Sequence, residues 1–225
     1  MSERRHAGTA YVVAPDAGAG PGVLVLHAWW GLTPFFKGVA DRLADAGFVA
    51  LAPDLFAGEK ASTPDEAEAL QAASDPNEAA ALVLSAASAL QGLPATTGTG
   101  IGIVGFSMGG SWALWAATRL PELVQAVVTF YGTTDLDPEP GRAAVQAHFP
   151  ELDELVTDDE KVLLESDLRV LGREVEVHHY TGTGHWFFEE DQAAAHDPIA
   201  AGLAWERTLA FLHRHLDAPE AEAAP

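Results

Sequence analysis

The segment GFSMG at residues 105–109 constrains what this chain can fold into more than any other feature. It follows an apolar run at 101–104, typical of a buried strand, and precedes a helix-like run at 110–120. The pattern G-x-S-x-G between strand and helix predicts a tight, strained turn, because a side chain at either glycine would clash with neighbouring elements. Such a turn lifts Ser107 clear of the sheet edge. We therefore expect Ser107 to be a nucleophile rather than part of an ordinary Gly-Ser turn.

Strand-like and helix-like segments alternate along the rest of the chain, which predicts a mostly parallel sheet with helices on both faces. The sequence shows no internal repeat and no long insertion that would form a lid. We predict one compact, lidless α/β domain over residues 1–217 and a disordered acidic tail at 218–225. The expected strands are 9–14, 23–26, 48–51, 101–106, 124–131, 143–149 and 174–180. The expected helices are 34–46, two within 62–92, 110–120, 157–172 and 198–216.

Three of these helices carry recognisable start sequences. Thr33 precedes Pro34, and Asp75 precedes Pro76, so each is expected to cap the helix that follows it. Residues 157–160 read Thr-Asp-Asp-Glu, which predicts a capping box.

The composition excludes several classes of function. Hydrophobic residues make up 48% of the chain, which is too many for general disorder. The 12 basic and 33 acidic residues give a net charge of -21, which repels nucleic acid and anionic lipid. No apolar run approaches the ~20 residues of a membrane span. We therefore expect neither nucleic acid nor a membrane among the partners.

The absence of cysteine removes disulfides, thiolate metal sites and a cysteine nucleophile. The first residues lack the apolar stretch of a secretory signal, so we expect a cytoplasmic protein. The histidine pairs 178–179 and 213/215 are not spaced to share one face, and there is no H-E-x-x-H. We expect no metal and no other cofactor.

A serine hydroxyl becomes a good nucleophile only when a neighbouring base takes its proton. On α/β sheets with this turn, the acid and the histidine follow the serine in the order Ser, Asp/Glu, His. His185 fits as the base because it follows the last expected strand, between glycines and before the final helix. The other eight of the nine histidines fall in expected strands, helices or termini.

The acid of this arrangement has several candidates. Asp153 follows the expected strand 143–149, immediately before the strand that leads to His185, and we favour it. Asp135 follows the earlier strand 124–131 and is the main alternative. Glu151, Glu154 and Asp137 also remain open. The acid would hold one tautomer of the imidazole and stabilise the imidazolium that forms during the reaction.

Two backbone N–H groups are expected to form an oxyanion hole, where negative charge develops. One belongs to Met108, the residue after the nucleophile. The other belongs to the segment 27–31 after the strand 23–26, where we choose Trp29. The alternative is that Trp29 and Trp30 are simply packed aromatic residues.

Several further blocks resemble the dienelactone hydrolase family over residues 8–216. They are LHAWWGL at 26–32, VADRLA at 39–44, GFVALAPDL at 47–55, GFSMGG at 105–110, HF at 148–149 with Asp153, and YTGTGHWF at 180–187. The resemblance implies a small, lidless α/β-hydrolase fold. It also implies a triad at Ser107, Asp153 and His185, which agrees with the choice made from chain order.

The chain departs from the best-known members of this family at three positions. Ser107 replaces their cysteine, and Ala28 stands where they keep a glutamate beside the thiol. Glu189 stands where an arginine would bind the carboxylate of a dienelactone, and an ionised acid there would repel that carboxylate. We therefore expect a neutral ester or lactone as substrate. The expected substrate-binding residues are Trp29, Trp30, Trp186, Phe187 and Glu189.

The predicted function is hydrolysis of small carboxylic esters or lactones through an acyl-enzyme on Ser107. Thioester or peptide hydrolysis and acyl transfer on the same triad are alternatives. A ligand-binding protein without catalysis is a further one, since a fold does not fix a function. We expect a monomer or a small homo-oligomer.

Overall fold

The computed structural model describes residues 10–134 and 141–217. The acidic tail at 218–225 and the alternative acids Asp135 and Asp137 lie outside these residues.

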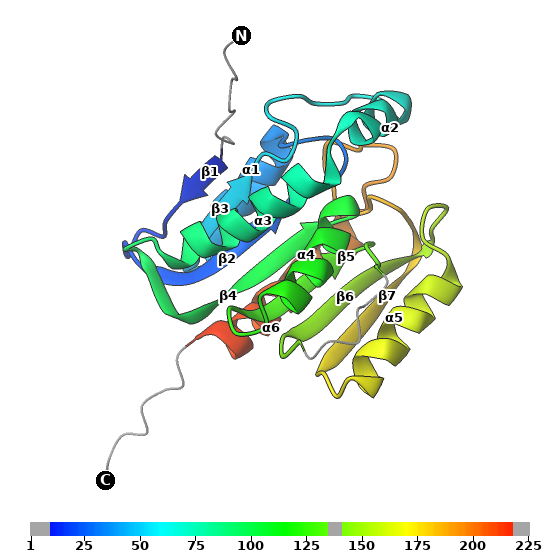
Figure 1. The fold of residues 1–225 in the computed structure, drawn as a ribbon. Helices are drawn as coiled ribbons and strands as arrows, with labels where there is room; N and C mark the ends of the chain where they lie inside the picture. The colour runs from blue at the N-terminus through cyan, green and yellow to red at the C-terminus, as the bar shows by residue number, and fades with distance from the viewer. Residues whose placement is uncertain (1–9, 135–140, 218–225) are drawn as a thin grey trace.

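The described residues form a seven-stranded sheet in the order β1-β3-β2-β4-β5-β6-β7 (Figure 1). Only β1 among these strands is antiparallel, pairing with β3 at one edge. The mostly parallel sheet predicted from the sequence is confirmed. The strands are β1 (Ala10–Val13), β2 (Gly20–Leu26), β3 (Val49–Pro53), β4 (Thr96–Phe106), β5 (Val124–Phe130), β6 (Ala144–Leu152) and β7 (Val175–Gly184).

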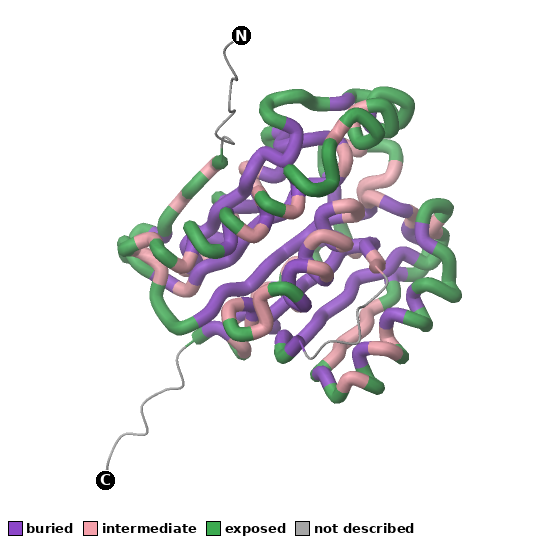
Figure 2. Tube along the Cα trace, viewed as in Figure 1, coloured by how far each residue is buried: buried purple, intermediate pink, exposed green. Residues whose placement is uncertain are grey.

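Helices cover both faces of the sheet (Figure 1). Helices α3, α4 and α5 contribute to one apolar cluster, and α1 and α6 to the other. Both clusters include side chains from the central strands, which are buried along most of their length (Figure 2). The helices are α1 (Pro34–Asp45), α2 (Pro64–Ala73), α3 (Pro76–Gln91), α4 (Met108–Arg119), α5 (Asp158–Val170) and α6 (Pro198–Leu216).

Two of the three expected helix caps form as predicted. Asp75 accepts the backbone N–H of Asn77, and Thr157 and Glu160 make a reciprocal capping box. Thr33 stands at the N-cap position of α1, but its hydroxyl caps nothing and donates instead to Asp191 (3.0 Å). The Thr33 side chain thus links the start of α1 to the segment after His185. The prediction that this side chain makes a capping hydrogen bond is wrong.

Strands β6 and β7 are longer than the sequence indicated. The expected strand 143–149 ends before Pro150, a residue that has no N–H for the ladder. The chain instead passes Pro150 with a shift of register against β7 and continues to Leu152. The two strands therefore end directly before Asp153 and His185, which brings these residues to the same edge.

The order of connections fixes where a ligand can enter. From β2 the chain runs to β3 on one side and later returns to β4 on the other. In open parallel sheets, a crevice forms outside the carboxyl ends of the strands where the direction reverses in this way. Segment 27–31 and Ser107 follow β2 and β4 respectively, and so they flank that crevice.

Candidate active site

Ser107 lies in a backbone conformation that non-glycine residues rarely adopt. Its φ is 50° and its ψ is -115°, between the end of β4 and the start of α4. A Cβ at Gly105 would lie 2.2 Å from the carbonyl oxygen of Gly109. A Cβ at Gly109 would lie 2.2 Å from the carbonyl oxygen of Leu26. The tight turn predicted from the two glycines is confirmed, and both glycines are required by backbone atoms that cannot move aside.

His185 joins Ser107 to Asp153. Its Nε2 lies 2.9 Å from the Ser107 Oγ, and its Nδ1 lies 2.8 Å from an Asp153 carboxylate oxygen. When Nδ1 carries the proton and donates to Asp153, Nε2 is free to accept the proton of the serine. The three side chains come from segments that follow β4, β6 and β7.

The surroundings of Asp153 keep its carboxylate ionised. Burial raises the pKa of this carboxyl, but hydrogen bonds from His185, Leu155 and Val156 lower it further, and the net pKa lies below the ordinary value. The backbone N–H groups of Leu155 and Val156 lie 2.9 and 3.1 Å from the oxygen that His185 contacts. The acid is therefore held in place as a charged partner for the imidazole. Glu154 is exposed, and Glu151 instead accepts the N–H of Gly182 (2.7 Å).

The two N–H groups chosen for the oxyanion hole are available. In the described ranges, neither the Met108 N–H nor the Trp29 N–H donates to another protein group. The segment that carries Trp29 is anchored by His27, which is fully buried. The His27 Nδ1 donates to the Ala28 carbonyl (2.7 Å), and its Nε2 accepts the Leu55 N–H (3.0 Å). Burial lowers the pKa of His27 to about 4, so the ring is uncharged at neutral pH and has a structural role.

The expected substrate-binding aromatics form one cluster beside His185. Trp29 and Trp186 are partly exposed and stack at 5.9 Å between ring centroids. Trp30 contacts both and is only 2% exposed, and Phe187 is fully buried. Trp29 and Trp186 are therefore the members of this cluster that a ligand can reach directly.

Glu189 is fully buried, and its Oε1 accepts a hydrogen bond of 2.6 Å from the Tyr131 hydroxyl. Burial raises the pKa of Glu189 to about 8. At neutral pH the carboxyl is largely protonated, so the charge on which the expected repulsion of a substrate carboxylate depends is absent.

Tyr131 is a site residue that the sequence reasoning missed. It follows β5 with a φ of 42°, it is fully buried, and its ring lies against the His185 imidazole with centroids 4.6 Å apart. The sequence showed only an aromatic residue at the end of an apolar strand, a pattern that core residues share.

A pocket of about 600 Å³ opens next to His185 and Trp186. Leu152 and Leu155 also line this pocket and are 62% and 49% exposed. Glu154 also lines it. The pocket can therefore hold an apolar group close to the triad, next to an acidic side chain.

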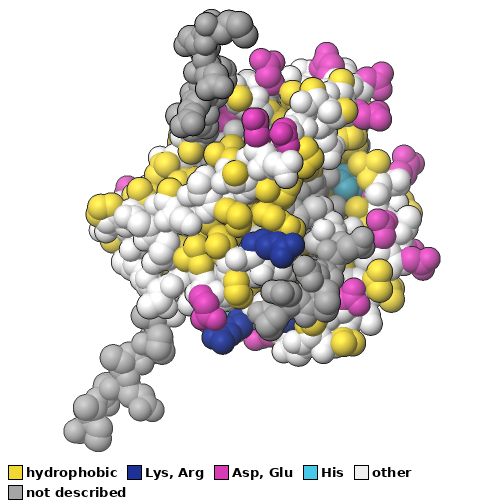
Figure 3. Space-filling view, in the orientation of Figure 1, with side chains coloured by type: hydrophobic (Ala, Val, Ile, Leu, Met, Phe, Trp, Pro, Cys, Tyr) yellow, Lys and Arg dark blue, Asp and Glu magenta, His cyan; other side chains and the backbone are white. Residues whose placement is uncertain are grey.

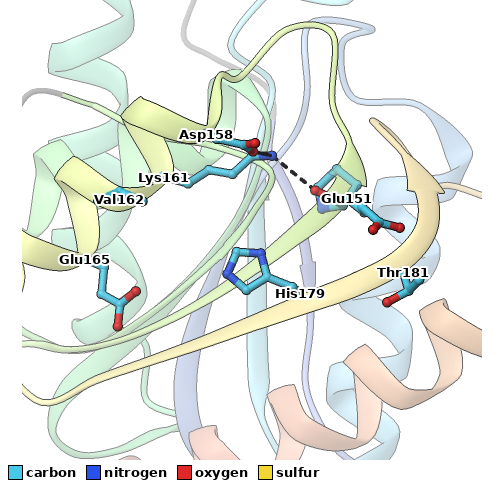
Figure 4. Close-up of a pocket in the computed structure, with 8 residues that line it drawn as sticks. Glu151, Asp158, Lys161, Val162, Glu165, His179 and Thr181 are labelled. Atoms are coloured by element: carbon cyan, nitrogen blue, oxygen red, sulfur yellow. Dashed lines mark hydrogen bonds and ion pairs between the residues drawn. The ribbon is translucent and has the colours of Figure 1, made fainter.

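A second pocket, of about 440 Å³, lies between α5 and the ends of β6 and β7 and includes none of the three triad residues (Figure 4). Lys161 reaches into it from α5 and is 4% exposed. Its amine donates to the Pro150 carbonyl (3.2 Å) and pairs with Asp158 (2.9 Å). Because Pro150 lies three residues before Asp153, this contact fixes the strand end that carries the acid.

Acidic residues outnumber basic ones, 33 to 12. Figure 3 shows them spread along the upper and right edges of one face, with basic side chains in its central and lower part. Among the described residues, no three His, Asp or Glu side chains are grouped as a metal ion would require. Within the same ranges, every helix is too short or too polar to span a bilayer.

Comparisons with known proteins show which family the chain belongs to. The model of the dienelactone hydrolase family matches residues 9–216. A putative carboxymethylenebutenolidase of Aquifex aeolicus is 34% identical, covering 92% of this chain and 93% of its own. A probable 2-oxo-3-(5-oxofuran-2-ylidene)propanoate lactonase of Bradyrhizobium is 35% identical, covering 92% and 89%.

A solved structure, a putative dienelactone hydrolase of Klebsiella pneumoniae, superimposes with a TM-score of 0.80 over 92% of this chain and 93% of its own. At 22% identity, this likeness shows the shared fold alone. The family match over nearly the whole chain and the relatives above 30% identity show more. The chain belongs to the dienelactone hydrolase family of α/β-hydrolases.

Proposed function

We propose that the chain hydrolyses small, uncharged carboxylic esters or lactones through an acyl-enzyme on Ser107. The observation that carries the proposal is the pair of hydrogen bonds at His185, one to Ser107 and one to Asp153. This is the arrangement that a serine nucleophile, its base and the orienting acid require.

In the first half of the reaction, the Ser107 oxygen attacks the ester carbonyl while its proton passes to the His185 Nε2. The Met108 and Trp29 N–H groups hold the oxyanion of the tetrahedral intermediate. His185 then gives the proton to the leaving alkoxide, and the acyl group remains on Ser107. Asp153 stabilises the imidazolium throughout.

In the second half, a water molecule takes the place of the alcohol. His185 accepts its proton, hydroxide adds to the acyl carbonyl, and the intermediate collapses to release the acid. The proton returns to the Ser107 oxygen. For a lactone, acid and alcohol leave as one ring-opened hydroxy acid.

The side chains around the site support the proposed substrate class. Trp29 and Trp186 offer aromatic surface, and the pocket beside His185 offers Leu152 and Leu155. A net charge of -21 disfavours anionic substrates. The names of the relatives, a butenolidase and a lactonase, support lactones. The propanoate in the second name is an anion, so the restriction to uncharged substrates rests on the net charge of this chain.

The test replaces the nucleophile. Ser107→Ala is expected to lower the turnover of a p-nitrophenyl ester by at least about a thousandfold while thermal unfolding is unchanged. Ser85→Ala, at an exposed serine of α3, is the matched control and retains full activity. Turnover in Ser107→Ala close to that of the control would refute the proposal.

A parallel assay separates the alternatives. Acyl-thioesters, aminoacyl anilides and a competing alcohol acceptor report on thioesterase, peptidase and acyltransferase activity. Saturable binding of esters without turnover would indicate a ligand-binding protein. We further propose one catalytic domain over residues 1–217 and a cytoplasmic location. We also propose a monomer or a small homo-oligomer, and light scattering measures this oligomeric state.

A further inference from the structure

Glu189 is linked to the triad through one neighbour. Its carboxyl accepts the Tyr131 hydroxyl at 2.6 Å, and the Tyr131 ring packs against the His185 imidazole at 4.6 Å between centroids. Glu189 and Tyr131 are both fully buried. The contacts therefore run from a carboxyl without solvent access to the ring that holds Ser107.

The backbone of Tyr131 needs support from its surroundings. A φ of 42° is unfavourable for a bulky residue and persists only where neighbouring groups determine it. The Tyr131 N–H donates to the His148 carbonyl (2.8 Å), which fixes the backbone end. The hydrogen bond to Glu189 fixes the far end of the side chain.

A carboxyl at this place requires a reason, because burying it is unfavourable. Phe187 and Phe188 beside it are buried hydrocarbon, and an apolar residue at 189 would pack without loss of hydration. What a carboxyl adds is an acceptor for the Tyr131 hydroxyl. Its second oxygen, Oε2, has no hydrogen-bond partner in the described part of the chain.

We infer that Glu189 is a positioning residue that holds Tyr131 against His185. With the Tyr131 ring fixed, the imidazole stays in line between the acid and the nucleophile. This role rests on the function proposed above, since it concerns the same histidine. Glu189 touches neither the substrate nor the reacting atoms.

Both charge states of Glu189 can accept the hydrogen bond on which this role depends. Burial raises its pKa to about 8. The Tyr131 hydroxyl favours the ionised form, and Asp191 on the same segment disfavours it. Near Tyr131 the further titratable groups are Asp153 and His185. Ionisation above about pH 8 keeps the acceptor and strengthens its hydrogen bond with Tyr131, because that hydroxyl favours the charged form.

The test is the pH profile of a reaction that needs only the nucleophile and its base, labelling by a fluorophosphonate probe. Glu189→Gln keeps an acceptor for Tyr131 and cannot ionise, so at pH 7 its labelling rate stays within about twofold of wild type. At pH 9 wild type also labels within about twofold of the variant, because ionised Glu189 still accepts the Tyr131 hydroxyl. Glu190→Gln, at the exposed neighbouring glutamate, is the control and follows the wild-type profile.

Two further variants separate positioning from folding. Glu189→Leu removes the acceptor and Tyr131→Phe removes the donor, so each slows labelling about tenfold at pH 7. The double variant is no slower than either single one, because both remove the same hydrogen bond. Thermal unfolding at pH 7 and pH 9 verifies that every variant is folded where it is assayed.

Labelling of Glu189→Leu or Tyr131→Phe at the wild-type rate, with Ser107 still labelled, would overturn the inference and leave the proposed function intact. Absence of Ser107 labelling in folded wild type would instead refute the proposed function. Additive losses in the double variant would also overturn the inference, since the two residues would then act independently.

Discussion

At the scale of single residues, the role of each histidine depends on the hydrogen-bond partners of its two ring nitrogens. His185 uses Nδ1 for Asp153 and Nε2 for Ser107, so its tautomer is set by a charged neighbour. His27, by contrast, has both nitrogens occupied by backbone groups and has a structural role. Burial alone does not separate these two histidines; their partners do.

Asp153→Asn should lower kcat at least about a hundredfold, because an amide can donate to Nδ1 and so favours the wrong tautomer. Steady-state kinetics on a neutral ester measure the loss. Glu154→Gln, at the exposed neighbouring position, is the control and stays within about twofold of wild type. Equal activities in the two variants would reassign the acid.

Glu189→Gln should change how stability depends on pH. An unfolded Glu titrates near 4.5, whereas the pKa of folded Glu189 is raised to about 8. Between these values the unfolded chain releases a proton that the folded chain keeps, so wild-type stability falls as pH rises and levels off above about 8.

Denaturant titrations across this range measure the effect. The stability of Glu189→Gln relative to wild type should rise by up to about 4 kcal/mol between pH 4.5 and pH 8.5. A constant difference over this range would show that Glu189 is already ionised in the folded protein.

At the scale of elements, loop placement follows from how the strands end. The register shift at Pro150 lets β6 reach Leu152, and the pairing of Leu152 with Gly184 aligns the residues that follow. The segments that carry Asp153 and His185 therefore start side by side at the ends of β6 and β7.

Gly109→Ala should disrupt the turn that carries Ser107. The new methyl group would lie 2.2 Å from the Leu26 carbonyl, so the backbone must shift, which costs about 1–3 kcal/mol or more. We expect a lower melting temperature and slower fluorophosphonate labelling. Gly38→Ala, in open space on α1, should instead stabilise by about 0.5–1 kcal/mol. Comparable effects of both substitutions would contradict the steric account.

Lys161→Met should weaken the support of the strand end before Asp153. It leaves the Pro150 carbonyl without the buried amine, at a cost of about 1–3 kcal/mol, and should lower kcat several-fold. Asp158→Asn changes only the exposed side of the ion pair, and exposed pairs contribute about 0–1 kcal/mol. Chemical denaturation and ester kinetics distinguish the two; equal losses would assign the support to the ion pair.

At the scale of the whole molecule, topology and charge decide what reaches the site. The reversal between β2 and β4 puts segment 27–31 and Ser107 at one crevice. The acidic surface then acts on any charged substrate before it binds.

The rate constant kcat/KM for an anionic ester should increase with salt relative to a neutral ester of the same shape, because screening at 0.1 M ionic strength acts over about 10 Å. A cationic ester should show the opposite trend. Salt series with the three esters test this, and identical salt responses would show that the net charge of -21 does not affect association.

Much of this architecture could be predicted from sequence because glycine, proline and apolar runs report local geometry. The strand segments and the turn at Ser107 follow from such patterns, and chain order led to Asp153 and His185, whereas the order of the strands within the sheet was not predicted. Contacts between distant segments left no local pattern. Tyr131 and Glu189, which form a hydrogen bond, are 58 residues apart in the sequence. Thr33 and Asp191, which form another, are 158 residues apart.

The most direct test of the account is peptide mapping by mass spectrometry after reaction with a fluorophosphonate. One adduct on the peptide that contains Ser107 is predicted, with no adduct in Ser107→Ala and much slower formation in His185→Ala. An adduct on a different serine, or equal labelling with and without His185, would contradict the triad.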